Sequence, residues 1–259
     1  MYIPLFNKSN YSLLSSLLKI DDIIKYAKNN NISSISLTDV NMYGTMEFIK
    51  KCRENDIKAI VGLNVILEKY NIVLLATSYQ GYKSLIKLST IQNERRVEED
   101  NLKTYNADLV CLLPFEYKEN IETLKKIYSN LYLGYKNKKE ETEALLQTTD
   151  IVFLRQNLYL NKTDSTYLPY LYRIRDGKTI SEETDYDIDD HELNIDNILE
   201  LTDNKGLINT MKIADSCNLV FPKATNLLPI YECDDPATYL FELCKAGLTK
   251  RCNGEIPQE

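Results

Sequence analysis

Apolar residues recur at helical spacing near the start of the chain. Between Lys19 and Asn31 they stand at Ile20, Ile23, Ile24 and Ala27. The spacing i, i+3, i+4, i+7 puts them on one face, as is typical of an amphipathic helix. Short runs typical of strands follow, separated by further segments with helical spacing. The pattern therefore predicts a βαβαβ order for the first part of the chain.

This alternation continues to about residue 160. The predicted strands are Ser34–Leu37, Ile57–Leu67, Ile72–Ala76, Ala107–Leu113, Leu131–Tyr135 and Ile151–Leu154, after a first one that begins at Tyr2. The predicted helices between them include Tyr43–Asn55, Tyr79–Thr90 and Glu116–Tyr128. Strands separated by helices imply parallel pairing with right-handed crossovers, in an open doubly wound sheet or a closed barrel. About seven strands favour the α/β barrel, whose chemistry would lie where the strands end.

Beyond Asn161 the pattern is helical. The predicted helices are Asp164–Arg175, Asp190–Leu201, Lys205–Cys217 and Pro236–Cys252. Between the last two, the segment Pro222–Asp235 contains prolines and shows no clear periodicity. We therefore expect a first domain over residues 1–221, and a connector with one further helix over residues 222–259.

Composition narrows the possible functions. Lys and Arg total 31 against 38 Asp and Glu, and the net charge of −7 disfavours direct DNA binding, which needs a basic surface. The chain has no apolar run near 18 residues and no signal-peptide pattern, so no membrane contact and a cytoplasmic location are predicted. Six cysteines without a C-x-x-C motif predict reduced thiols, and a single histidine leaves few ligands for a Cys/His zinc site.

Six segments carry a resemblance to a known family. In order they are YSLLSSLLKIDDIIKYAKNNNISSISLTD, YGTMEFIKKCRENDIKAIVGLNV, IVLLATSYQGYKSLIKLS, RIRDGKT, INTMKIADSCN and LLPIYECDDPATYLFELCKAGLTKR. Together they resemble the PHP (polymerase and histidinol phosphatase) domain, the N-terminal domain of the alpha subunits of bacterial DNA polymerase III. The resemblance covers nearly the whole chain and is weakest between Ile91 and Asp150.

This resemblance implies a PHP-type distorted TIM-like (β/α)7 barrel over residues 1–221 and the first helix of a polymerase palm region within residues 222–259. The parent enzyme would be a DNA-directed DNA polymerase, a nucleotidyltransferase whose three palm aspartates hold Mg²⁺ and lie beyond Glu259. No cofactor is expected in residues 1–259 themselves. The expected partners are the remaining polymerase domains of the same chain and a proofreading exonuclease or other replication subunits, with DNA reached only through the parent enzyme.

The same resemblance implies where a metal site would lie. The positions at which the family carries metal ligands hold Phe6, Lys8, Ser15, Asp39, Val40, Asn64, Gln156 and Leu158 in this chain. A cluster of zinc or manganese ions needs several imidazoles and carboxylates. Phe6, Val40 and Leu158 offer no donor atom, and Lys8 brings a positive charge. The prediction is a lost metal site with no catalytic residue.

Two alternatives concern Lys8. If Lys8 and Asp39 both point into the barrel mouth, the ammonium would take the place of a metal ion and pair with the carboxylate, because an unpaired buried anion is costly. Alternatively, the Lys8 side chain simply reaches solvent.

Two alternative functions are also compatible with parts of the resemblance. The barrel could retain metal-dependent phosphoesterase, pyrophosphatase or 3′–5′ exonuclease activity, which the missing imidazoles oppose. A free-standing phosphatase of amino-acid metabolism is opposed by the polymerase-like C-terminal segment. The favoured interpretation is a noncatalytic domain with a structural and interaction role in DNA replication.

Three further groups of residues admit an ordinary structural interpretation. The acidic run TDYDIDD at residues 184–190 resembles a two-metal site, but Asp189 with Glu192 has the form of a helix capping box, which would leave His191 exposed. Arg95 and Arg96 with the acids that follow predict a solvated loop. Tyrosines 167, 170 and 172 are expected on one helix, in the core or at an interface.

Overall fold

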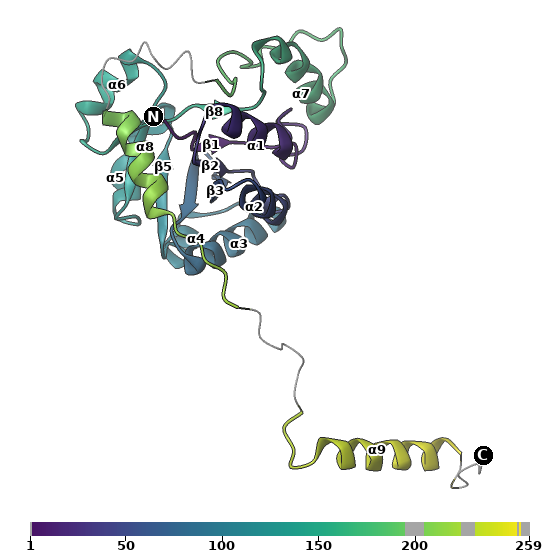
Figure 1. Ribbon diagram of the computed structural model, residues 1–259. Coiled ribbons are helices and arrows are strands. Elements are labelled where there is room, and N and C mark those ends of the chain that lie inside the picture. The colour runs from purple at the N-terminus through teal and green to yellow at the C-terminus, as the bar shows by residue number, and fades with distance from the viewer. Residues whose placement is uncertain (1, 195–204, 224–230, 253, 255–259) are drawn as a thin grey trace. The chain divides into compact units, whose positions relative to one another are not determined.

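The computed structural model describes residues 2–194, 205–223, 231–252 and 254. They form two compact units, residues 1–221 and 222–259. The first unit contains the sheet and most of the helices (Figure 1). The second contains one described helix.

The strands of the first unit curl into a barrel. Their bounds are β1 (Phe6–Asn7), β2 (Ser34–Leu37), β3 (Lys58–Ile66), β4 (Asn71–Ala76), β5 (Leu109–Leu113), β6 (Leu131–Tyr135), β7 (Ile151–Phe153) and β8 (Gln156–Asn157). Strands β2 to β7 form one sheet in chain order, while β1 pairs with β8 in parallel. The Thr38 N–H donates to Asn7 O at 2.8 Å, so β1 also meets β2. The expected distorted α/β barrel is confirmed.

The direction of one strand was predicted wrongly. Strand β4 runs antiparallel to both β3 and β5, whereas the other pairs in the sheet are parallel. Only four residues, 67–70, connect β3 to β4. Such a short connection allows a hairpin but no helical crossover, which needs a dozen residues or more.

Helices cover the sheet as Figure 1 shows. Their bounds are α1 (Ile20–Asn29), α2 (Thr45–Glu54), α3 (Tyr79–Glu94), α4 (Glu99–Thr104), η1 (Phe115–Asn120), α5 (Ile121–Lys125), α6 (Lys138–Leu145), η2 (Lys162–Tyr167), α7 (Leu168–Asp176) and α8 (Lys205–Ser216). Helix α1 buries the four apolar residues that predicted it and carries Asp21 and Asp22 in its first turn, where the helix dipole favours acids.

Two predictions of local structure, one of a loop and one of a helix, need correction. The acidic residues after Arg96 were predicted to form a solvated loop, but Glu99–Thr104 is the short helix α4, and Arg96 pairs with Glu68 at 3.1 Å. The helix predicted for Asp190–Leu201 does not form over residues 190–194, where Glu192 makes a parallel bridge to Tyr159. Its remaining residues, 195–201, lie outside the described residues.

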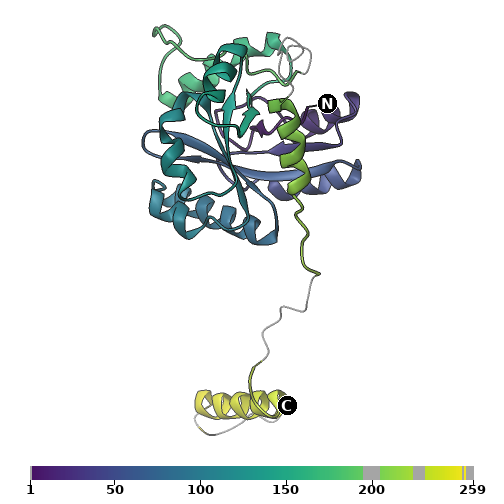
Figure 2. The ribbon, with the colours of Figure 1, turned by 90° about the vertical axis from the view of Figure 1, so that its left-hand side faces the viewer.

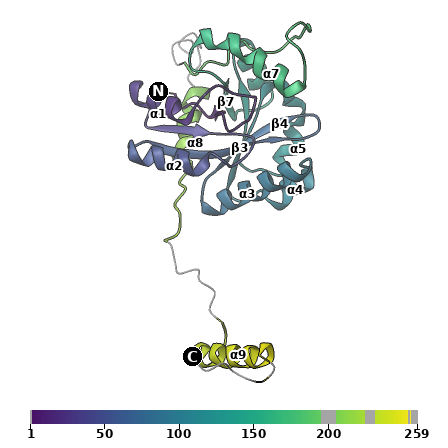
Figure 3. The ribbon, with the colours of Figure 1, turned by 90° about the vertical axis from the view of Figure 1, so that its right-hand side faces the viewer.

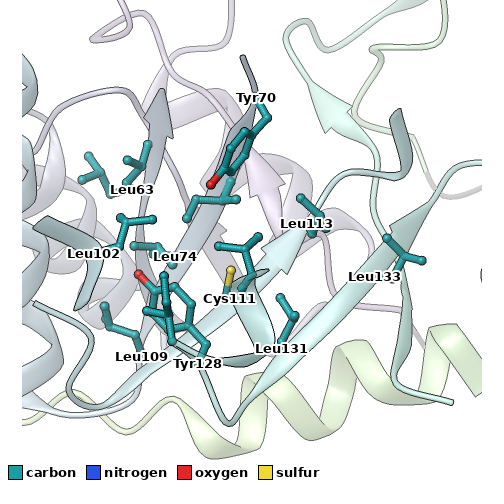
Figure 4. Packing of buried hydrophobic residues seen from close by; sticks show 14 of the residues in the cluster. Leu63, Tyr70, Leu74, Leu102, Leu109, Cys111, Leu113, Tyr128, Leu131 and Leu133 are labelled. Carbon is teal, nitrogen blue, oxygen red and sulfur yellow. The ribbon is translucent and has the colours of Figure 1, made fainter. Parts of the chain in front are cut away.

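Both faces of the sheet are buried in apolar cores. Along β5, Leu109, Cys111 and Leu113 join one cluster, while the alternate residues join the other. Figure 4 shows the first cluster, where Leu74 of β4 and Leu131 of β6 point toward Cys111 among the leucines. A strand that is covered on both faces reads as a continuous apolar run, which explains the clear strand signal in LVCLL.

Helix α8 lies alongside the strands in Figure 2 and is joined to them by side-chain hydrogen bonds. Asn209 Nδ2 donates to Ile151 O at 2.8 Å, and the Ile3 N–H donates to Thr210 Oγ1 at 3.1 Å. In Figure 3, α2 and α3 lie on one side of the first unit and α7 on the opposite side. Helix α8 thus ties the first residues of the chain to β7.

The second unit contains helix α9 (Pro236–Arg251). Asp235 caps it, since its carboxylate accepts from the N–H groups of Ala237 and Thr238. The rings of Tyr231 and Tyr239 stack with centroids 5.0 Å apart. The assignment of this unit to a polymerase palm region stays a prediction.

All six cysteines are free thiols, as predicted. Among the described residues, no helix is both long enough and apolar enough to cross a bilayer.

Candidate functional site

The carboxyl ends of β1, β2 and β3 meet at one rim of the barrel, which we call the mouth. The Ser9 N–H, just after β1, donates to Asp39 Oδ1 at 2.6 Å. The Asn64 N–H of β3 donates to Asp39 O at 2.9 Å. Residues from three strands are therefore brought around Asp39, which follows β2.

The Asp39 carboxylate is buried and fully engaged by hydrogen-bond donors. Besides the Ser9 N–H, Ser9 Oγ donates to Oδ2 and Ser12 Oγ donates to Oδ1, each at 2.6 Å. Burial raises the pKa of Asp39, while the bonds from Ser12 and Ser9 and the charge of Lys8 oppose the rise. This carboxylate serves mainly as an anchor for the turn after β1.

The Lys8 ammonium is the buried positive charge of the mouth. Its side chain is buried, and its Nζ lies 5.6 Å from the centre of the Phe6 ring. With the Asn64 amide oriented so that both of its ends are satisfied, Lys8 Nζ donates to the amide oxygen at 3.0 Å and the amide nitrogen donates to Ile72 O at 3.2 Å. Burial lowers the pKa of Lys8 to about 8, the Asp39 charge opposes this, and Arg175 adds to it.

The structure excludes the solvent-exposed alternative for Lys8 and, within the other alternative, a direct contact with Asp39. The ammonium does not reach solvent, because the residue is only 9% exposed. Nor does it contact the carboxylate directly, since no ion pair of 4.0 Å or less joins these two described residues. Lys8 and Asp39 act on each other through space, and each has its own neutral hydrogen-bond partners.

The other positions implied by the resemblance fall into three groups. Phe6 and Leu158 are buried; the Phe6 ring lies beside Lys8, while Leu158 joins a small core with Tyr159. Ser15 turns away, since its hydroxyl donates to Leu13 O in an exposed setting. Val40 and Gln156 are partly exposed. The structure thus brings Lys8, Asp39 and Asn64 together but does not add Ser15.

Several residues that hold the mouth together were missed by sequence reasoning. Gln92 of α3 donates from Nε2 to Val40 O at 2.7 Å and to Asn64 O at 3.0 Å. Ser16 Oγ lies 2.6 Å from Lys8 O and 3.0 Å from Leu158 O. The one available signal was the density of serines after β1, because small hydroxyl residues in a turn commonly bond to nearby groups.

His191 was predicted to be exposed, and this is wrong. The residue is buried, with Nδ1 3.0 Å from Gln156 O and Nε2 3.4 Å from Asp187 Oδ2. Its backbone carbonyl also accepts from the Leu158 N–H, so it packs on β8 rather than beginning a helix. Of the three tyrosines, Tyr172 is buried in a small core, while Tyr167 and Tyr170 are exposed.

The residues of the mouth do not fit a metal cluster. The Asp39 carboxylate already accepts from hydroxyl and amide donors among the described residues. The buried Lys8 side chain beside it is a cation, which would repel a metal ion. Across the described ranges, no group of three or more His, Cys, Asp or Glu side chains is placed to hold a metal ion.

The buried amine predicts a pH dependence of stability. Below about pH 8 both folded and unfolded chains carry the Lys8 proton, so the full cost of burying the charge is present. As the pH rises from about 8 toward the unfolded value of 10.5, the folded chain releases its proton first and this cost is relieved.

The unfolding free energy of the wild type should therefore rise relative to that of Lys8→Met by about 2 kcal/mol between roughly pH 7 and 9.5. Urea titrations of both proteins across that range measure the difference in unfolding free energy. Because the tyrosines and thiols titrate in both proteins, their contributions cancel in this difference. A constant difference would contradict the prediction.

The chain is similar in sequence to curated proteins over nearly its whole length. The DNA polymerase III subunit alpha of Borreliella burgdorferi is 29% identical over 96% of this chain and 27% of its own length. That of Ureaplasma parvum is 27% identical over 100% of this chain and 26% of its own length. The chain thus spans about a quarter of the length of these relatives.

Among solved structures, an amidohydrolase from Chromobacterium violaceum is similar with a TM-score of 0.44 and 10% identity, covering 60% of this chain and 87% of its own. The family model of the PHP domain matches residues 5–165, more than half of the chain. Those residues include every strand from β1 to β8, and the chain belongs to the PHP domain family.

Proposed function

We propose that this chain is the PHP region of a replicative DNA polymerase alpha subunit and that its role there is structural rather than catalytic. The similarity to alpha subunits over nearly its whole length supports the first part. The buried Lys8 ammonium, at a position where the family carries a metal ligand, is the single observation that supports the second.

In this proposal, nucleotidyl transfer with Mg²⁺ belongs to the polymerase domains of a longer chain, and residues 222–259 form the connector and the first helix of its palm region. The barrel packs against those domains and offers surface to a proofreading exonuclease or another replication subunit. A coding sequence that continues past residue 259 is expected to specify three palm aspartates.

Metal analysis tests the noncatalytic role. Residues 1–259, purified without chelator, should contain far less than one equivalent of zinc, manganese or iron, because the mouth offers one engaged carboxylate and a cation. The protein should also fail to hydrolyse a phosphomonoester, pyrophosphate or the 3′ end of single-stranded DNA. Stoichiometric metal together with hydrolysis that EDTA abolishes would establish the hydrolase alternative.

A further inference from the structure

The mouth contains both a buried positive charge and a buried negative charge, and both are side chains of this protein. The buried cation Lys8 follows β1 and the buried anion Asp39 follows β2, and the charges of Asp39 and of Arg175 in α7 both act on Lys8. A buried charge is tolerated when other charges or hydrogen bonds compensate it. Asp39 has three hydrogen-bond donors, and Lys8 has the Asn64 amide oxygen and the Phe6 ring.

We propose that the Lys8 ammonium is a built-in substitute for a metal ion: it joins the carboxyl ends of β1 and β3 through Asn64, balances the Asp39 carboxylate through space, and closes the mouth to divalent cations. This inference rests on the proposed noncatalytic role and adds the mechanism by which the mouth keeps its structure without a metal.

The contacts around Lys8 support this substitution. A metal ion would hold several strand ends together through shared ligands. Here Lys8 Nζ bonds to the side chain of Asn64, whose backbone N–H bonds to Asp39 O, and the Asp39 carboxylate returns to Ser9 beside Lys8. These contacts form a closed circuit through β1, β2 and β3. Asn64 suits the circuit because a neutral amide accepts from the ammonium without adding a second buried anion.

The first test is the energetic coupling of Lys8 to Asp39. Lys8→Met, Asp39→Asn and the double variant are unfolded in urea near pH 7. In the wild-type background, Lys8→Met loses an attraction to the carboxylate that is already absent from the Asp39→Asn variant. The factor by which Lys8→Met raises the unfolding equilibrium constant should therefore be about fivefold larger in the wild type than in the Asp39→Asn variant. The exposed Asp100 is the matched control, and Asp100→Asn should show no coupling to Lys8→Met.

The second test restores donor atoms. The double substitution Lys8→His with Asn64→Glu removes the ammonium and places an imidazole and a carboxylate beside Asp39. Zinc binding, measured by competition with a chromophoric chelator, should be at least about 100-fold tighter than in the wild type, since three protein ligands suffice for a zinc site. Circular dichroism checks that the variant folds.

The outcomes separate this inference from the proposed function. Coupling together with restored zinc affinity supports the substitution. A metal-free wild type with additive variants, or a folded double variant that binds zinc no better than the wild type, overturns the substitution and leaves the noncatalytic role intact. Should the double variant not fold, the coupling measurement alone decides. Stoichiometric zinc in the wild type overturns both proposals.

Discussion

Replacement of Asp39 by alanine is expected to lower the unfolding free energy of the first unit by about 4 kcal/mol. The substitution leaves the Ser9 N–H, Ser9 Oγ and Ser12 Oγ without their acceptor in a buried setting. It also removes the anion that offsets the buried Lys8 ammonium. Relief of the carboxylate's own desolvation offsets only part of this loss. Urea denaturation followed by circular dichroism measures the change.

Two further variants serve as comparisons for Asp39→Ala. Asp100→Ala removes a carboxylate whose side chain is 85% exposed. It should cost less than about 1 kcal/mol. Ser12→Ala removes one of the three donors to Asp39 and should fall between the two. If Asp39→Ala were no more destabilising than Asp100→Ala, the hydrogen-bonded carboxylate would not be an anchor of the mouth.

The second large effect is expected from Gly81→Ala, with a loss of about 3 kcal/mol. A Cβ at Gly81, in the first turn of α3, would crowd the backbone oxygen of Asp108. That oxygen cannot easily move, because it accepts from both the N–H and the hydroxyl of Thr77. Asp108 is also in the left-handed region, with φ of 53°. Thermal and urea unfolding of the purified variant measure the loss.

Lys87→Ala is the matched control for Gly81→Ala, because it adds alanine to the exposed face of the same helix. Alanine is a slightly better helix former than lysine, so the control should stay within about 0.5 kcal/mol of the wild type. A Gly81→Ala protein that is as stable as this control would mean that α3 can shift away from the Asp108 carbonyl at little cost.

The elements that sequence could predict are those fixed by local burial. Helix α1 and strands β2 and β5 are covered by neighbours on one or both faces, so their apolar spacing carries the signal. Strand direction carries no such signal, since a run of buried residues reads the same both ways. The short LEKY connection before β4 was the available clue to the hairpin.

The mouth was harder to predict because its contacts join distant parts of the chain. The resemblance located Lys8, Asp39 and Asn64, but their bonding depends on which neighbours the fold supplies. Ser9 and Ser12 satisfy the carboxylate and Asn64 takes the ammonium, so the expected direct ion pair is replaced. His191 is buried for a similar reason, because its partner Gln156 lies 35 residues earlier in the chain.

The reversed direction of β4 has a mechanical consequence. Because β4 begins beside the mouth and ends at the opposite edge of the barrel, α3 starts at that far edge, where Gly81 packs on Asp108. Its 16 residues then rise about 24 Å, at about 1.5 Å each, back to the mouth, where Gln92 bonds to Val40 after β2 and to Asn64 in β3. Helix α3 thus connects the two edges of the barrel. A displacement of its N-terminal turn, beside Asp108, would also move Gln92 at the mouth.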